Sequence, residues 1–502
     1  MTGHYRKQFS SSLSYSAYPA DSVRRLEQRA VSELGLSLYQ LMERAGYAAF
    51  QRARQYFPTT RRWLVLCGHG NNGGDGYVVA RLARQSGIQV TLIAVEHSKA
   101  LPYEAQQAQD AWVGAGGQIF GSTSDFPEDA DLIIDGLLGI GLNAAPREPY
   151  ASLILSANAH PAPILALDIP SGLNADTGQA VGAVIHAQHT QTFIVCKPGL
   201  LTGQARDYVG KLHCDALGLS DWLEKQNAPI ARLDASLLNT WLHPRRPCSH
   251  KGDNGRLVLI GGDRGMAGAI RMAGEAALRS GAGLVRVLTH IEHVSPLLTA
   301  RPEMMVQELT DESVNAALDW ADVIVIGPGL GQSEWALDAV KALQRFDKPM
   351  LWDADALNLL AKSPNVNPLR VLTPHPGEAA RLLNCSVADI ELDRVKAATR
   401  IQQKLGGVVV LKGAGTLMVS ENKVSIADVG NPGMGTGGMG DVLSGIIGGL
   451  LAQKLPLYDA ACAGCVVHGA AADEIAKAFG ERGLLATDLF VAIRRYVNPD
   501  WA

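Results

Sequence analysis

The chain has 502 residues, a length that predicts two to four domains rather than one. Hydrophobic residues make up 47% of it, charged residues 19% and aromatic residues 6%, which favours a soluble α/β enzyme over a disordered, fibrous or disulfide-rich chain. The net charge of −4 provides no broad attraction for nucleic acid or for an anionic membrane, so we expect neither as a partner.

The first residues of the chain and its cysteines indicate in which cellular compartment the protein is expected. The first twenty residues carry positive charge and serines without a continuous apolar core, and we expect a tail or arm rather than a secretory signal. The seven cysteines are scattered and odd in number, which favours reduced thiols in a cytoplasmic protein. No apolar segment reaches the 18 or so residues that would cross a bilayer.

Two amphipathic helices are expected first, one from Asp21 to about Leu34 and one over residues 37–57, because apolar residues recur there at spacings of three and four. Short apolar strands then alternate with helical stretches. The strands are WLVLC (63–67), QVTLIAV (89–95), DLIIDGLLG (131–139), PILALDI (163–169) and TFIVC (192–196). Apolar strands separated by helices indicate a parallel sheet that is covered on both faces.

The alternation of strands and helices begins again after residue 225. New apolar runs include RLVLIGG (256–262), GLVRVLT (283–289), DVIVIGPGLG (322–331), PMLWDADALNLL (349–360), RVLTPHPGEAARLL (370–383) and GGVVVLKGAGT (406–416). The sequence therefore predicts two α/β domains, residues 1–225, with the tail or arm at 1–20, and residues 226–502.

A glycine-rich loop follows the first of these strands. Gly68, Gly70 and Gly73 match G-x-G-x-x-G, a pattern that lets a backbone approach a pyrophosphate at the start of a helix. Asn72 and Asp75 add polar side chains that a bare turn would not require. We therefore expect this loop to bind a dinucleotide or its phosphate.

Two further loops carry acids just past their strands, with Asp135 in one and Asp168 and Ser171 in the other. Asn72, Asp135 and Ser171 could together offer oxygen ligands to a monovalent cation. We expect the three loops to converge on one pocket. An Asx turn or a helix cap is the alternative role for Asp168.

Four motifs in this half carry a family resemblance: MERAG (42–46), GNNGGDG (70–76), DGLLGIGL (135–142) and DIPSGLNADTG (168–178). Over nearly all of residues 20–220 the chain resembles the NAD(P)H-hydrate epimerase family. The resemblance implies a Rossmann-like three-layer fold. It also implies interconversion of the R and S forms of NADHX and NADPHX, which are NADH and NADPH with water added to the nicotinamide ring.

The same resemblance implies site residues. Asn72, Asp135 and Ser171 would hold potassium, and Asp168 would contact the hydrated ring. Our hypothesis is that Asp168 is the general acid–base group. The cofactor's phosphates and ribose would be bound by Asn71, Asn72, Gly73, Gly74, Asp75, Gly139, Ile140, Gly141, Leu142, Asn143, Ala144 and Ala145.

In the second half, GNPGMGTGGMGD (430–441) runs into an apolar helix. Amide groups of such a loop can stabilise the charge on a transferring phosphoryl group, and an acid at its edge can take a proton from the attacking hydroxyl. Asp441 is therefore the predicted catalytic residue of this half. A role as N-cap of the helix from Val442 is the alternative, and it is compatible with catalysis.

Other strand ends in the second half also carry polar residues. LKGAGT (411–416), with a lysine and two glycines at the end of a strand, is a candidate binding segment for adenylate phosphates and ribose. Asp353, Asp355, His375 and Glu378 lie at successive strand ends, and His375 could instead be a hydrogen-bonded loop residue. The sequence has no G-x-x-x-x-G-K-[ST], so the phosphate site is not a Walker-type loop.

With HKGDNGRLVLIGGDRGMAGA (250–269) and GPGLG (327–331), these motifs resemble the ADP-dependent NAD(P)H-hydrate dehydratase family of ribokinase-like fold, from about residue 230 onwards. The resemblance implies that ADP phosphorylates the S hydrate and that loss of phosphate then restores NAD(P)H, leaving AMP and phosphate. Magnesium would screen the phosphates. The hydrated cofactor would be contacted by Ala269, Gly331, His375 and Asp441, and the adenine nucleotide by Lys412, Gly413, Ala414, Gly415, Thr416 and Gly440.

The sequence departs from the family pattern at Asp253-Asn254, where Thr-Tyr is frequent, and at Met439, where Thr often stands. Met439 could alter nucleotide preference. The prediction is a bifunctional metabolite-repair enzyme, a homo-oligomer acting on NADHX, NADPHX and ADP. The alternatives are a ribokinase-like small-molecule kinase with an N-terminal nucleotide- or RNA-binding module and, with least support, an NAD-dependent dehydrogenase.

Overall fold

The computed structural model describes residues 13–96, 98–343 and 346–499. Contacts between Cα atoms divide the described chain after Ala231 into two compact units, whereas the predicted boundary lies near residue 225. Most of the predicted tail falls outside the described residues. Of its remainder, Ser16–Ala17 form the short strand β1, which pairs antiparallel with Ile230 and Ala231 of β9 (Ile230–Leu233).

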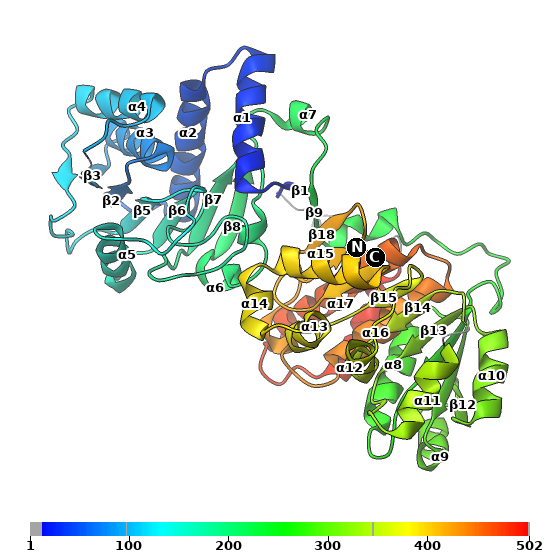
Figure 1. The fold of residues 1–502 in the computed structure, drawn as a ribbon. Coiled ribbons are helices and arrows are strands. Elements are labelled where there is room, and N and C mark those ends of the chain that lie inside the picture. Colours follow the sequence, from blue (N-terminus) through cyan, green and yellow to red (C-terminus); the bar gives the residue numbers. More distant parts are fainter. Residues whose placement is uncertain (1–12, 97, 344–345, 500–502) are drawn as a thin grey trace. The chain divides into compact units, whose positions relative to one another are not determined.

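The first unit is built on a seven-stranded parallel sheet of order β4-β3-β2-β5-β6-β7-β8 (Figure 1). Its strands are β2 (Arg62–Cys67), β3 (Gln89–Ala94), β4 (Phe120–Gly121), β5 (Leu132–Gly136), β6 (Ile164–Leu167), β7 (His189–Phe193) and β8 (Lys211–Asp215). Its helices are α1 (Ala20–Leu34), α2 (Leu38–Tyr56), α3 (Asn71–Gln85), α4 (Tyr103–Gly114), α5 (Tyr150–Ala159), α6 (Ala205–Tyr208) and α7 (Ser220–Leu223). The predicted elements of this half are present.

Alternate residues of the central strands enter two different cores. Trp63 and Val65 pack with residues of α1 to α4, while Leu64 and Leu66 pack with residues of α5. Side chains of a strand point alternately to opposite faces, so a strand covered on both faces is apolar throughout. The first unit therefore has the three layers that the sequence predicts.

Local signals explain where the first helices begin and end. α2 starts at a capping box in which Ser37 and Gln40 bond each other's backbone N–H, and α1 ends at Gly35 in the left-handed conformation. The strand predicted at 192–196 lies at 189–193 instead. After His189, which is half-buried, its next three residues are polar but buried, with Thr190 Oγ1 donating to Val209 O at 2.8 Å. The strand ends where Ile194 takes a φ of +65°.

The second unit contains a mixed sheet of order β9-β18-β17-β16-β15-β14-β13-β10-β11-β12. Neighbouring strands from β12 to β16 run parallel, and β17 and β18 form an antiparallel extension that the sequence analysis did not predict. The strands are β10 (Arg256–Ile260), β11 (Leu284–Thr289), β12 (Met305–Glu308), β13 (Val323–Ile326), β14 (Met350–Trp352), β15 (Arg370–Leu372), β16 (Val408–Leu411), β17 (Leu417–Val419) and β18 (Val424–Ala427).

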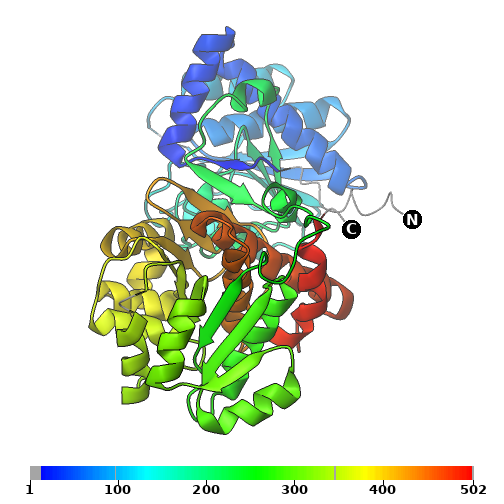
Figure 2. The ribbon, with the colours of Figure 1, turned by 90° about the vertical axis from the view of Figure 1, so that its right-hand side faces the viewer.

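Helices cover both faces of this second sheet, as the sequence predicts. α16 packs between α8 and α17 on one face, and Figure 2 shows the yellow helices on one side of the sheet and the red helices on the other. The helices are α8 (Ala267–Arg279), α9 (Ile291–Ala300), α10 (Asp311–Trp320), α11 (Glu334–Ala342), α12 (Ala354–Lys362), α13 (Pro376–Leu383), α14 (Val387–Leu392), α15 (Arg394–Leu405), α16 (Met439–Ala452), α17 (Leu457–Phe479) and α18 (Leu489–Tyr496).

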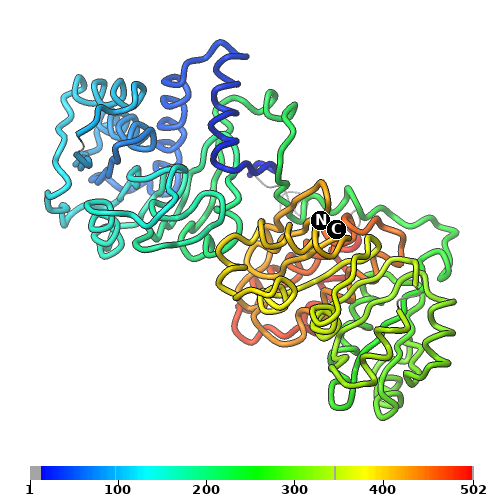
Figure 3. Tube along the Cα trace, viewed as in Figure 1, coloured from blue at the N-terminus to red at the C-terminus, as the bar shows by residue number. Residues whose placement is uncertain are grey.

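In both units, most strands of the parallel sheet are followed by a loop and then by a helix, as the trace in Figure 3 shows. All seven cysteines are free thiols. Within the described residues, no helix combines the length and apolar character needed to span a membrane.

Candidate active sites

Three loops meet at the carboxyl edge of the first sheet, after the neighbouring strands β2, β5 and β6. The chain places β3 and β4 on one side of β2 and β5 to β8 on the other, so the strand order reverses between β2 and β5. Open α/β sheets bind ligands outside such a reversal point. The topology therefore positions all three predicted loops at one ligand-binding edge.

Glycines let the first two loops touch. A Cβ on Gly68 would lie 1.7 Å from the carbonyl oxygen of Leu137, and one on Gly73 would lie 2.1 Å from that of Gly68. A Cβ on Gly139 would lie 3.3 Å from the Cβ of Asn72. These contacts bring the loop at 139–145, which is half-buried to exposed, against the start of α3.

Asn72, Asp135 and Ser171 lie together, as the motifs predict. Ser171 donates to Asp135 twice, from Oγ to Oδ1 at 2.6 Å and from its backbone N to Oδ2 at 2.8 Å. Asn72 Nδ2 donates to Leu138 O at 3.0 Å, and the backbone N of Leu138 donates to Ser171 Oγ at 2.8 Å.

The oxygen atoms of this cluster fit a hard cation. Asp135 is fully buried, and burial raises the pKa of its carboxyl to about 6 against the opposing effect of the Ser171 hydrogen bonds. Asn72 Oδ1 is buried without a hydrogen-bond partner among the described residues. A buried oxygen without a partner is costly, and a bound cation would satisfy it.

Asp168 is held by long-range contacts rather than by its own turn. Its φ of +61° is unusual for a residue other than glycine, and such outliers cluster at functional sites. Its Oδ1 accepts hydrogen bonds from Thr192 Oγ1 at 3.0 Å and from Lys197 Nζ. The Asx turn or helix cap considered for Asp168 has no support in these contacts.

Lys197 is a site residue that sequence reasoning missed. Its side chain is 1% exposed, and Nζ also donates to Thr192 Oγ1 at 2.9 Å and to Phe193 O at 3.1 Å. The available signal was a lysine directly after a buried apolar run, since charged residues are almost never fully buried unless they are paired. Lys197 thus places a positive charge on the carboxylate of Asp168.

Acidic groups surround this ion pair. Burial raises the pKa of Asp75 well above its usual range, and the negative charges of Asp168 and Glu27 raise it further while Lys197 lowers it. Glu27 lies on α1, outside every motif quoted above. The structure thus assembles three carboxyl groups and one ammonium group at the edge where the loops meet.

In the second unit, Asp441 occupies the first turn of α16. The N-cap position belongs to Gly438, whose φ is +89°, so the N-cap role considered for Asp441 is wrong. Burial raises the pKa of Asp441 to about 7, the charge of Asp353 adds to the shift, and Lys412 opposes it. A carboxylate with a pKa near neutrality is suited to take a proton from a hydroxyl.

Lys412 is bonded to a carboxylate beside Asp441. Its Nζ donates to Asp353 Oδ1 at 2.8 Å and lies 3.9 Å from Glu378 Oε2, while Ser444 Oγ donates to Asp353 Oδ2 at 2.7 Å. A Cβ on Gly440 would lie 3.3 Å from Lys412 Nζ. The structure therefore brings together two of the residues predicted to bind the adenine nucleotide, Lys412 and Gly440.

The rest of LKGAGT forms a tight turn. Thr416 Oγ1 donates to Gly413 O at 3.0 Å, and Gly413 and Gly415 both have positive φ. Arg394 supports the turn from α15, donating to Lys412 O at 3.0 Å. Ala414 completes the segment, which follows directly from β16.

His375 is the N-cap of α13, and its side chain is 50% exposed. Nδ1 accepts a hydrogen bond from Gly377 N at 3.0 Å, and the backbone N of His375 donates to Glu378 Oε2 at 2.8 Å. The loop role considered for His375 is thus present, and half of the side chain remains open to a ligand. Burial, together with Lys412 and Arg381, lowers the pKa of His375, whereas burial raises that of Glu378 to about 7.

Ala269 and Gly331 lie on neighbouring segments. Gly331 N donates to Asp355 Oδ2 at 2.9 Å, and its missing Cβ would be 2.8 Å from Asp263 Oδ2. Ala269, in the first turn of α8, has its Cβ 3.2 Å from the Cβ position of Gly329. Asp263 is a further neighbour that the sequence analysis did not single out.

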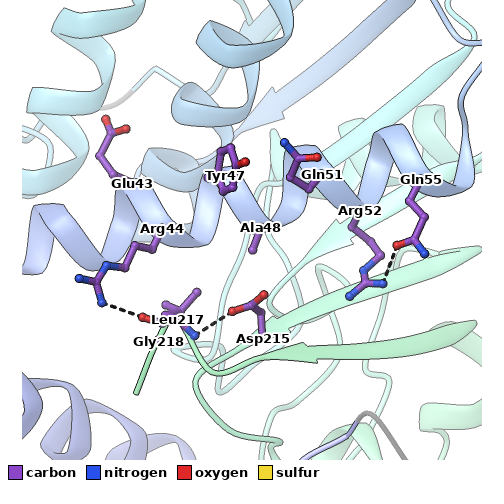
Figure 4. Close-up of a pocket in the computed structure, with 10 residues that line it drawn as sticks. All are labelled: Glu43, Arg44, Tyr47, Ala48, Gln51, Arg52, Gln55, Asp215, Leu217 and Gly218. Atoms are coloured by element: carbon purple, nitrogen blue, oxygen red, sulfur yellow. Dashed lines mark hydrogen bonds between the residues drawn. The ribbon is translucent and has the colours of Figure 1, made fainter. Parts of the chain in front are cut away.

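A pocket of about 500 Å³ in the first unit involves none of the predicted residues. It lies between α2 and the loop after β8 (Figure 4). Arg44 donates to Leu217 O, the backbone N of Leu217 donates to Asp215 Oδ1, both at 2.8 Å, and Arg52 pairs with Gln55 at 2.9 Å. Because these polar groups satisfy one another, we assign the pocket no chemistry.

Both halves of the chain match known families. Residues 38–199 match a family described as the YjeF-related protein N-terminus, and residues 257–495 match one described as NAD(P)H-hydrate dehydratase. A protein of Escherichia coli strain K12, named bifunctional NAD(P)H-hydrate repair enzyme Nnr, is 62% identical over 501 residues, covering 100% of this chain and 97% of its own. A Vibrio cholerae protein of the same name is 46% identical over 96% of this chain and 98% of its own.

A solved structure supports the fold of the second unit. A ribokinase-like superfamily protein from Enterococcus faecalis is 33% identical, covers 55% of this chain and 97% of its own, and gives a TM-score of 0.51. The fold and the two sites define an α/β enzyme with a Rossmann-like unit followed by a ribokinase-like unit. The chain belongs to the family of bifunctional NAD(P)H-hydrate repair enzymes.

Proposed function

We propose that the chain repairs hydrated NADH and NADPH in two reactions. The first unit interconverts the R and S hydrates. The second dehydrates the S hydrate in an ADP-dependent reaction that yields NAD(P)H, AMP and phosphate. The observation that carries this proposal is the 62% identity to the Escherichia coli repair enzyme along the whole chain, which includes both sets of motifs.

In the first unit, Asp168 exchanges a proton with the hydrated ring. The loops at 71–75 and 139–145 bind the phosphates and ribose of the cofactor, using backbone amides at the start of α3. Asn72, Asp135 and Ser171 hold potassium, which supplies a positive charge near the phosphates when it is bound. The unpartnered Asn72 Oδ1 supports this assignment.

In the second unit, Asp441 takes the proton of the substrate hydroxyl as this oxygen attacks the terminal phosphate of ADP. Amide groups at the start of α16, beginning at Gly440, stabilise the charge on the transferring phosphoryl group. The turn at 412–416 binds the nucleotide, and Ala269, Gly331 and His375 contact the hydrated cofactor. Magnesium bound with ADP would screen the phosphates.

The test is recovery of reduced-nicotinamide absorbance from mixed R and S hydrates of NADH, with potassium, magnesium and ADP present. Complete recovery faster than the uncatalysed conversion of the R hydrate would support both activities. Recovery of the S fraction alone would contradict the epimerase assignment. Absence of ADP-dependent recovery would favour the small-molecule kinase. A cytoplasmic location and a homo-oligomer remain predictions.

A further inference from the structure

The first helix of the first unit lies against the epimerase loops, although the matched family region begins only at residue 38. The backbone N of Ala20 donates to Asp176 Oδ1 at 2.7 Å, and Ala20 packs with Ile169 and Leu173. Arg24 Nη2 lies 3.1 Å from the Cβ position of Gly141. α1 therefore touches both the loop after β5 and the loop after β6.

Glu27 lies one turn beyond Arg24 on this helix and is half-buried. Residues three apart on a helix share a face, so the placement of Arg24 over Gly141 brings Glu27 toward the same edge. Its charge interacts with those of Lys197, Asp168 and Arg24, and it also raises the pKa of Asp75. Burial raises the pKa of Glu27 to about 7, with Lys197 opposing and Asp168 adding to the shift.

The neighbouring carboxyl group, Asp168, has a different environment. Lys197 and Thr192 both donate to Oδ1, and among the described residues no donor pairs with Oδ2. These two hydrogen bonds hold the carboxylate of Asp168 in one orientation and place an ammonium group against one of its oxygens. Two carboxyl groups in one site, one facing an ammonium group and the other half-buried on a helix, are suited to opposite roles in acid–base chemistry.

We propose that Glu27 is a second catalytic residue of the epimerase site and works as the proton donor opposite Asp168, with Lys197 as the positioning residue that orients Asp168 as the proton acceptor. This inference rests on the proposed epimerase function. It assigns a catalytic role to α1, a helix outside the motifs that identify the family.

The chemistry requires both roles. Water adds to an enamine with its oxygen on the carbon beside the ring nitrogen, so epimerisation must move a hydroxyl between the two faces of that carbon. The C–O bond breaks with its electron pair going to oxygen, Glu27 gives this oxygen a proton, and the nitrogen lone pair forms a C=N bond. Water then adds to the opposite face, the C=N electrons return to nitrogen, and Asp168 accepts the proton. Exchange with solvent resets both groups.

The test is the pH dependence of epimerisation in full-length Glu27→Gln, measured with excess ADP and magnesium so that R-hydrate conversion limits recovery. A proton donor must be protonated, so the wild-type kcat should fall as pH rises above about 7. Glu27→Gln should lower kcat about 100-fold and remove this alkaline fall, with little change in KM. Glu33→Gln, on the same helix, is the matched control and should keep the wild-type rate.

Lys197→Met should lower kcat for epimerisation with little change in KM, because Asp168 loses the partner that orients it. Lys197→Arg should restore the rate in part. Dehydration of the S hydrate by each variant shows that its second unit is folded. Circular dichroism with thermal unfolding shows whether the first unit is folded as well.

Three outcomes would overturn the inference. A wild-type rate in Glu27→Gln would exclude Glu27 from the chemistry, and a slow variant that keeps the alkaline fall would show that Glu27 only supports the structure. A wild-type kcat in Lys197→Met, or no recovery of rate in Lys197→Arg, would remove the positioning role. A wild-type chain without epimerase activity would instead overturn the proposed function, and the inference with it.

Discussion

The two units place a lysine beside their predicted catalytic aspartates in different ways. In the first unit Lys197 bonds the catalytic carboxylate itself, Asp168. In the second unit Lys412 bonds Asp353 instead, and Asp441 stands beside this pair with its pKa raised to about 7 by burial. The same residue types thus give two different aspartates. Asp168 is held in place by an ammonium group, whereas Asp441 gains or loses its proton near neutral pH.

The largest expected effect would separate the two units. Asp441→Asn should lower S-hydrate dehydration by about 1,000-fold, since an amide cannot accept the hydroxyl proton. Epimerisation, followed by chromatographic separation of the R and S hydrates, should be unchanged. Loss of both activities together would show that the two units do not act independently.

A second change tests the packing that brings the epimerase loops together. Gly73→Ala should destabilise the first unit by about 2 kcal/mol, because the new methyl group would meet the backbone oxygen of Gly68 at 2.1 Å. Gly70→Ala is the matched control, since no residue beyond its chain neighbours lies within 4 Å of its Cβ position. Denaturant unfolding followed by circular dichroism would measure both, and equal losses would contradict the close-contact explanation.

The pH profile of dehydration sharpens the contrast between the aspartates. Asp441 must be ionised to accept a proton, so kcat should fall about tenfold for each pH unit below its pKa of about 7. Lys412→Met should move this limb to higher pH, because Lys412 lowers the pKa of Asp441. The measurement is the initial rate on purified S hydrate from pH 5 to 8, and a flat profile would contradict the role of Asp441.

The smallest effect concerns the support of the Lys412–Asp353 pair. Ser444→Ala removes the hydroxyl that donates to Asp353 Oδ2, and should cost about 1 kcal/mol in the free energy of unfolding of the second unit. The dehydration rate should change less than threefold. A loss of rate comparable with that of Asp441→Asn would instead place Ser444 in the chemistry.

The sequence predicted the site best where loops follow adjacent parallel strands. Asp135 lies at the end of β5 and Ser171 in the loop after β6, and strand pairing alone brings them to one edge. Long-range partners were harder to foresee. Lys412 and Asp353 lie 59 residues apart, and no local pattern reports that they meet.

Two residues were missed for separate physical reasons. Lys197 follows a backbone turn at Ile194, where the strand prediction extended too far because it relied on apolar character alone. Glu27 lies on a helix whose apolar periodicity identifies the buried face but says nothing about which loops the polar edge meets. Both depend on how elements pack, which periodicity does not encode.

The left-handed backbone of Asp168 also limits how this position can change in evolution. Aspartate, asparagine and glycine tolerate a φ of +61°, while other side chains lose about 1 kcal/mol or more there. Only aspartate of these three supplies a carboxylate. Glutamate, the nearest chemical substitute, is disfavoured by the backbone, so the fold itself makes the acid at this position hard to replace.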